Sequence, residues 1–341
     1  MDLHLSILVN NLRKVGDLRR LGSYPVLLMV LLVGTCNAYG NVSLLVEEPY
    51  GFFGSIIPTG HSAIYLNRVC AESPTMLRRC GPGETGVVIS RYSRIRAFDW
   101  VAIPLLPYLY AVERAEDVPA WAEVDDVEKM RMAYAETHLT SLFSATKRYD
   151  DKTVWPQLLG VAYIRKIYSF EIATTDEQDD HLIAEYNDRA NRSHFNLFTN
   201  NCADFSSRIL NFYYPHAVGR SLTADIAITT PKQVAKSLVH YARRHDGLDL
   251  GEVIIPQVQG SIPRSHTPRG VVESLLKTKK YAVPIAILNP YVLASIAVTY
   301  IARGRFDFAK NIPVIPVKDQ EQMLFGGKPK TTVESFVDSE Q

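Results

Sequence analysis

The sequence predicts an α+β fold in which an antiparallel sheet packs against helices. Two segments, His61 to Val69 and residues 87–95, are rich in β-formers and are separated by the turn sequence GPGETG. They therefore predict a β-hairpin with a long connection. Four segments further along the chain have the spacing of amphipathic helices. The domain built from these elements is expected to cover residues 41–250, which is long enough to bury a sizeable core.

The predicted helices follow the hairpin in chain order. Before them, the stretch DWVAIPLLPYLYAVE is apolar but contains two prolines, and is interpreted as a loop with short pieces of structure. Apolar residues recur on one side of residues 124–144, which predicts the first helix. The second begins near Asp176 with acidic residues in its first turn, where the helix dipole favours them. The third begins at Cys202, and the fourth has Thr230 as its cap and Pro231 at its first position.

A basic segment followed by a short apolar run lies near the N-terminus. Four basic side chains between residues 13 and 20 precede the sequence PVLLMVLLVGTCNAYG, an order that is typical of a secretory signal. We therefore expect a signal peptide or an anchor over residues 1–38, with cleavage after Ala38. A lipid attached to Cys36 is an alternative, because VGTC resembles a lipoprotein box.

A second apolar run lies near the C-terminus. Its sequence, YAVPIAILNPYVLASIAVTYIA, contains no charged residue and has basic residues on both flanks. A membrane-spanning helix needs about 20 apolar residues, and this run has that length. We expect a transmembrane segment at 281–303, preceded by a linker over 251–280 and followed by a charged tail over 304–341. A buried hairpin or an interfacial segment is the alternative.

Charge and cysteine usage narrow the classes of function. The 37 basic residues nearly balance the 36 acidic ones, so no global basic field points to a nucleic-acid partner. Cys70 and Cys80 bracket the short loop AESPTMLRR, and such a pair closes a disulfide in an oxidising compartment. Cys202 is then left without a partner. A leftover cysteine in an exported protein is either reactive or buried.

Cys202 lies where a thiol is easiest to ionise. At the start of a helix, unpaired backbone N–H groups and the helix dipole stabilise a thiolate, and the same N–H groups stabilise an oxyanion. Such a nucleophile also needs a base, which in proteins is most often histidine. Of the nine histidines, His61 opens a predicted strand, from which it can reach a neighbouring helix start. The alternative is a hydrogen-bonded histidine with a purely structural role.

Two motifs give the chain a resemblance to a known superfamily. GHSAIYL, followed far downstream by TNNCADFS, resembles the circularly permuted NlpC-type papain-like superfamily. That superfamily includes lecithin–retinol acyltransferases and bacterial cell-wall cysteine hydrolases, and in it the histidine strand precedes the cysteine helix. The resemblance covers approximately residues 55–215. It implies a permuted papain-like fold with Cys202 as the nucleophile and His61 as the base.

The chain departs from that pattern at the third catalytic position. The family places a polar residue on the strand after the histidine, but VVISRYSRI contains no His, Asp, Asn or Gln. The third polar or oxyanion-binding group is therefore expected to be one of a small set: Ser90, Tyr92, Glu84 and Asn201. No cofactor is expected. A zinc site made by His61 and the three cysteines Cys70, Cys80 and Cys202 is disfavoured, because none of the close ligand spacings of zinc sites is present.

The sequence thus predicts a cysteine hydrolase that acts on amide or ester bonds, with cell-wall peptide as the favoured substrate. It is expected to be exported to the periplasm or cell envelope and to be associated with a membrane. A lipid acyltransferase or lipase of the same fold is one alternative. A non-catalytic envelope protein that keeps the fold for binding is the other. The oligomeric state is left open by the sequence.

Overall fold

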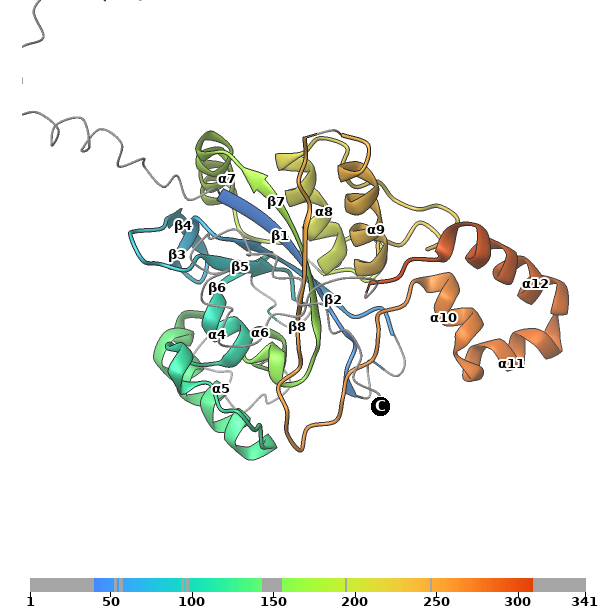
Figure 1. Cartoon of the computed structure of the whole chain (residues 1–341), viewed down its shortest axis with the longest axis horizontal. Helices are drawn as coiled ribbons and strands as arrows, with labels where there is room; N and C mark the ends of the chain where they lie inside the picture. The colour runs from blue at the N-terminus through green and yellow to red at the C-terminus, as the bar shows by residue number, and fades with distance from the viewer. Residues whose placement is uncertain are drawn as a thin grey trace, which may run out of the picture. The chain divides into compact units, whose positions relative to one another are not determined.

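A six-stranded antiparallel sheet organises the chain (Figure 1). The computed structural model describes residues 40–308, apart from 52–53, 55–57, 93–94, 96–97, 143–154, 194 and 246. The expected signal segment, with Cys36, and nearly all of the expected charged tail lie outside the described residues. The strand order in the sheet is β6-β5-β2-β1-β7-β8, and all neighbours pair antiparallel. The α+β prediction with an antiparallel sheet is therefore confirmed.

The strands of this sheet come from both halves of the described chain. They are β1 (Gly40–Glu47), β2 (His61–Leu66), β5 (Val87–Ser90), β6 (Val101–Pro104), β7 (Ile167–Thr174) and β8 (Gly251–Ile255). A separate hairpin consists of β3 (Val69–Ser73) and β4 (Met76–Arg79). The first predicted strand therefore ends at Leu66 and continues, after a turn, as the hairpin.

Helices cover both faces of the sheet (Figure 1). The α-helices are α4 (Leu105–Tyr110), α5 (Val124–His138), α6 (Trp155–Leu158), α7 (Asp176–Asp188), α8 (Cys202–Tyr213), α9 (Pro231–Ala242), α10 (Val271–Lys277), α11 (Lys279–Leu288) and α12 (Pro290–Thr299). Shorter turns are η1 (Ala115–Asp117), η2 (Thr140–Leu142), η3 (Val161–Tyr163) and the π-helix η4 (Tyr300–Gly304). The four helices predicted from sequence periodicity correspond to α5, α7, α8 and α9.

Alternation along the central strands divides the core into two clusters. Leu44 and Ile64 belong to the cluster that includes α8 and α9, whereas Leu45 and Ala63 belong to the cluster that includes α4 and α5. Successive side chains of a strand point to opposite faces, so one strand supplies both clusters. All four side chains are almost completely buried, and burying a leucine or isoleucine contributes about 1.5–3 kcal/mol.

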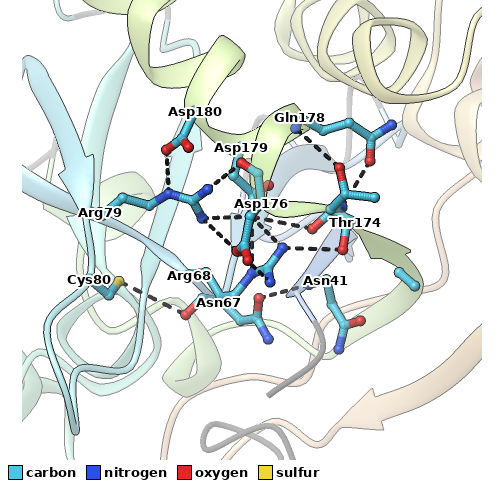
Figure 2. A network of polar contacts seen from close by, with 12 residues as sticks. Asn41, Asn67, Arg68, Arg79, Cys80, Thr174, Asp176, Gln178, Asp179 and Asp180 are labelled. Carbon is cyan, nitrogen blue, oxygen red and sulfur yellow. Dashed lines mark hydrogen bonds and ion pairs between the residues drawn. The ribbon is translucent and has the colours of Figure 1, made fainter. Parts of the chain in front are cut away.

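A disulfide and an ion network fix the β3–β4 hairpin. Cys70 and Cys80 are joined by a bond of 2.08 Å, as predicted. Figure 2 shows Arg68 and Arg79 reaching the acidic first turns of α7, where both contact the buried carboxylate of Asp179. The covalent link thus closes the hairpin, and charge holds the hairpin against α7. Because the two sulfurs are bonded to each other, neither is available as a thiolate for the zinc site considered from the sequence.

Two segments differ from their sequence-based interpretation because both add strands to the sheet. DWVAIPLLPYLYAVE, expected to be mostly loop, forms β6 and α4, and Pro104 lies at the junction of the two elements. Residues 251–280, expected to be a linker, supply edge strand β8 and then α10. Prolines at an element junction or at a sheet edge remove no necessary ladder hydrogen bond, which is why they did not interrupt these elements.

The apolar run at 281–303 is folded into separate pieces. Helix α11 ends at Leu288, Asn289 caps the next helix by accepting from the amides of Tyr291 and Val292, and Pro290 occupies its first position. None of the helices in the described ranges is long and apolar enough to cross a membrane. The single spanning helix predicted over this run is therefore not what the structure shows. Asn–Pro favours a new helix start over continuation, because proline excludes the preceding residue from the helical region.

Candidate active site

Cys202 is the first residue of α8, and a capping box fixes its position. The Asn201 side chain accepts hydrogen bonds from the amides of Ala203 at 2.8 Å and Asp204 at 3.0 Å, and the Asp204 carboxylate accepts from the Asn201 amide at 3.1 Å. Reciprocal capping of this kind satisfies the orphan donors of a helix start. The helix start predicted from the sequence is confirmed. The cap leaves the amide of Cys202 itself, at the first helical position, outside its hydrogen bonds.

Asn201 serves this cap instead of an oxyanion. Its carbonyl oxygen accepts the two bonds described above, and its amide nitrogen donates to the backbone oxygens of Leu197 at 2.9 Å and Thr229 at 3.0 Å. A primary amide has two donor hydrogens, and both are used. The sequence-based expectation that Asn201 could bind an oxyanion is therefore corrected to a positioning role.

His61, the first residue of β2, is oriented by Ser90, the last residue of β5. The Nε2 atom of His61 lies 2.9 Å from the Ser90 hydroxyl, and that hydroxyl donates to the backbone oxygen of Ser62 at 2.8 Å. A serine hydroxyl has one hydrogen to donate. Of the two neutral tautomers, the one that satisfies both contacts carries its hydrogen on Nε2 of His61. The Nδ1 atom is then the one with a free lone pair, as a neutral general base requires.

The remaining candidates for a third group lie in different places. The ring of Tyr92 stacks on the His61 ring, with centroids 5.3 Å apart and planes inclined by 23°. Glu84 lies in the turn after β4, where it pairs with Arg78 and accepts from the amide of Gly81. The Arg78 hydrogen bond lowers the pKa of Glu84 to about 2. Ser90 and Tyr92 therefore contact the histidine, whereas Glu84 serves the β3–β4 hairpin.

The thiol of Cys202 lies beside Ser62, the residue that follows His61. Burial raises the Cys202 pKa, and hydrogen bonds from the Ser62 amide, the Ser62 hydroxyl and the Ala203 amide oppose this effect. The Ser62 hydroxyl is free to donate to sulfur because it accepts from Ser206 at 3.0 Å. Ser62 and Ser206 are fully buried. Together with Ser90, these hydroxyls link the first turns of α8 to the start of β2.

A buried ion pair lies next to the histidine. Glu47 is the cross-strand partner of His61 in the β1–β2 register, and its carboxylate accepts from both Arg165 and Tyr108. Glu47, Arg165 and Tyr108 are all buried, and burial raises the Glu47 pKa. Arg165 also lies over the Tyr50 ring, 4.5 Å from its centroid. A fixed positive charge is thus held close to the imidazole.

The ionisation of the resting pair differs from the sequence-based prediction. A thiolate–imidazolium pair would have a low cysteine pKa and a high histidine pKa. Instead, burial and then the charge of Arg165 lower the His61 pKa well below 6.5, and burial raises the Cys202 pKa. No hydrogen bond joins the two side chains in the described part of the chain. Both groups are therefore neutral at pH 7, because a buried site disfavours each charged form.

Sequence reasoning missed most of the groups that surround the pair. Ser62 adjoins His61 and Ser206 lies one helical turn after Cys202, so their positions could have been noticed from spacing alone. Glu47 and Arg165 are separated by 118 residues. No local pattern connects them, and only the pairing of β1 with β7 brings them together.

Replacing Ser90 with alanine should disturb the orientation of His61. It would leave the buried Nε2–H without its acceptor, which typically costs about 1–3 kcal/mol, and we expect labelling of Cys202 by a thiol-reactive probe to slow about tenfold because the base is misplaced. Stopped-flow labelling at several pH values measures this. Ser43→Ala is the matched control, because Ser43 also has a buried hydroxyl, but one without a hydrogen-bond partner. Equal effects of the two variants would contradict the orienting role.

Comparisons with known proteins do not assign the chain to a family. No protein-family model, no curated protein and no solved structure matches it. The function must therefore be argued from the geometry and chemistry of the site.

Proposed function

We propose that the protein is a cysteine hydrolase or acyltransferase that acts on amide or ester bonds, with Cys202 as nucleophile and His61 as general base. The observation that carries this proposal is the contact between Nε2 of His61 and the Ser90 hydroxyl, which favours the tautomer with its hydrogen on Nε2. In this tautomer the Nε2–H is directed to Ser90, so the basic Nδ1 belongs to a neutral ring one residue from the serine that contacts the thiol.

The neutral resting pair defines the order of proton transfers. As the sulfur attacks the substrate carbonyl, Nδ1 of His61 takes the thiol proton, and the S–C bond forms. The imidazolium then gives this proton to the leaving amine or alcohol as the C–N or C–O bond breaks. Water, or an acceptor alcohol or amine, attacks the resulting thioester, and its proton returns through His61 as the thiolate leaves. The Cys202 amide at the start of α8 is suited to stabilise the oxyanion.

The proposed setting is an exported protein at the cell envelope. The Cys70–Cys80 disulfide supports an oxidising compartment, since such bonds are rare where thiols are kept reduced. Cell-wall peptide is the favoured substrate, as the motif resemblance implies. Lipid is the alternative acyl donor, and the exposed apolar side chains of α11 and α12 favour it, among them Ile287, Leu288 and Tyr291. These side chains are also what supports association with a membrane.

A non-catalytic binding protein is the second candidate function. The residue Cys202 is only 9% exposed, and a buried thiol with a raised pKa is also what a structural cysteine would have. The arrangement of Ser90, His61 and Ser62 favours the catalytic alternative, because it holds a neutral histidine next in sequence to the serine that contacts the buried thiol.

Trapping the thioester tests the proposal. The full chain is incubated with p-nitrophenyl acetate, with cell-wall peptides and with phospholipid vesicles, and acyl groups are located by peptide mass spectrometry. Acylation of Cys202 with turnover of one of these donors is expected, and Cys202→Ser should remove it. Acylation spread over lysines, with no change in Cys202→Ser, would show that the thiol is structural.

A further inference from the structure

A large cavity lies away from the Cys202–His61 pair. It has a volume of about 930 Å³. Its lining comes from α9, from the loop that follows α8, from the start of α10 and from η4. This volume is at the upper end of the range for small-molecule sites, which is about 300–1,000 Å³. Neither Cys202 nor His61 lines it, so the cavity is not part of the proposed active site.

Positive charge predominates in the lining. Lys232, Lys236 and His240 follow one another at intervals of four along α9 and therefore lie on one side of the helix. Arg303 approaches from η4, where its backbone oxygen accepts from Lys236. Arg244 adds a further guanidinium just after the end of α9. Lysine and arginine side chains outnumber acidic ones in this lining by five to two.

The two acidic residues of the lining are already engaged. Glu273 accepts from Lys232 at 2.6 Å and from Lys277 at 2.7 Å. Asp225 accepts from the Thr230 hydroxyl at 3.2 Å and from the Val271 amide at 2.8 Å, which joins the start of α9 to that of α10. In contrast, Lys236, Arg244 and Arg303 have no carboxylate within ion-pair distance among the described residues. The unbalanced charge of the cavity is therefore positive.

The pKa values of two lining groups are those expected in a positive field. Burial lowers the Lys236 pKa and the charge of Lys232 adds to the effect, although Asp225 opposes it. Burial and then Lys236 and Arg244 lower the pKa of His240, to which Arg243 also contributes. Like charges held close together disfavour protonation, and an anion among them would relieve this repulsion.

We propose that this cavity binds a phosphate ester. The phosphate would pair with Lys236, Arg244 and Arg303. Charge-assisted hydrogen bonds to phosphate are among the stronger polar contacts in proteins. Both a free polyol phosphate and the headgroup of an anionic phospholipid have this chemistry. Helices α11 and α12 lie in the sequence between Glu273 and Ala302, which both line the cavity. These two helices expose apolar side chains that could contact a lipid surface and so bring a headgroup to the cavity.

Binding of defined probes to the full chain tests the proposal. Calorimetry is used with glycerol phosphate and with glycerol, which lacks the phosphate. Sedimentation is used with phosphatidylcholine vesicles that contain or lack phosphatidylglycerol. Glycerol phosphate should bind, whereas glycerol should not. Lys236→Gln combined with Arg303→Gln should weaken binding about tenfold or more, because hydrogen bonds to charged groups are lost. Arg243→Gln is the matched control, since Arg243 adjoins Arg244 at the end of α9 but does not line the cavity.

The outcomes distinguish a free phosphate ester from a lipid headgroup, and both from non-specific attraction of anions to the positive surface of the protein. Cavity-dependent binding of glycerol phosphate would show that a free phosphate ester is sufficient. Cavity-dependent binding of phosphatidylglycerol vesicles alone would identify a lipid headgroup. Equal loss of binding in Arg243→Gln and in the double variant would mean that the overall positive surface is responsible, and the proposal would fail. It would also fail if neither probe bound saturably. Because no thiol chemistry is involved, Cys202→Ser protein should bind as the wild type does.

Discussion

Replacing His61 with alanine should lower the rate of Cys202 acylation at pH 7 by about a hundred- to ten-thousand-fold, the usual contribution of a positioned general base. The thiol is buried and its pKa is raised, so few molecules carry the thiolate at neutral pH without help. In the variant, ionisation must come from hydroxide. The residual rate should therefore increase about tenfold for each pH unit until the thiol titrates, and the difference from the wild type should shrink above pH 9.

The wild-type pH profile and the ultraviolet absorbance of the thiolate together test this mechanism against a preformed ion pair. Burial and Arg165 lower the His61 pKa well below 6.5. The active form has neutral imidazole and neutral thiol, so the rate should stay flat as pH falls through 6.5 and decrease only when His61 gains a proton. Ultraviolet absorbance of a thiolate within this flat range, lost in Cys202→Ser, would instead indicate a thiolate–imidazolium pair. His181→Ala, which removes an exposed histidine on α7, should leave the profile unchanged.

The parts of the site that could be predicted are those determined by local sequence. The helix start at Cys202, the amphipathic spacing of α8 and the strand that begins at His61 each depend on a few consecutive residues, and each is found where the sequence placed it. The disulfide was predictable because Cys70 and Cys80 are only ten residues apart. Ser90 was one of four candidates for a third group. Its contact with His61 depends on the β2–β5 register, which brings the end of β5 beside the start of β2.

The parts that could not be predicted depend on distant segments or on competing local signals. β7 was not recognised as a strand, although it pairs with β1 over its whole length. Most residues of β7 are buried, and Glu171 lies among them, so polar and apolar residues do not alternate simply along this strand. The apolar run at 281–303 has the composition of a membrane span, but Asn289 and Pro290 together favour a helix start in its middle. The length and hydropathy of a segment indicate how favourably it would enter a bilayer, but they do not reveal a helix cap such as Asn289 within it.

The ionisation state was predicted in the wrong direction for a similar reason. A helix start and a nearby histidine both argue for a thiolate, and those effects are present, since the Ser62 and Ala203 donors do lower the Cys202 pKa. Burial outweighs them, and burial follows from the packing of the whole sheet. Arg165, whose charge lowers the His61 pKa, lies just before β7 and is more than a hundred residues away from the histidine in the sequence.

Removing the positive charge of that arginine should have the largest effect on stability. Arg165→Met would leave the Glu47 carboxylate buried without its partner, and breaking a buried ion pair in this way typically costs about 3–5 kcal/mol of unfolding free energy. Denaturation by urea, followed by tryptophan fluorescence, measures the change. Lys129→Met is the matched control. It breaks the exposed pair with Asp126, whose atoms are 2.9 Å apart, and should cost less than about 1 kcal/mol.

The double variant shows whether the cost is that of an uncompensated charge. Arg165→Met combined with Glu47→Gln keeps an acceptor for Tyr108 and leaves no buried charge, so it should be more stable than Arg165→Met alone. A double variant that is less stable, by the sum of two separate losses, would mean that packing and not charge is responsible.

The Arg165→Met substitution should also change the ionisation of His61 in the candidate active site. Without Arg165, one of the two causes that lower the His61 pKa is gone, and the acidic limb of the acylation profile should move to higher pH. It should move whether Glu47 stays ionised or takes up a proton, because a carboxylate beside the imidazole would only raise the His61 pKa further.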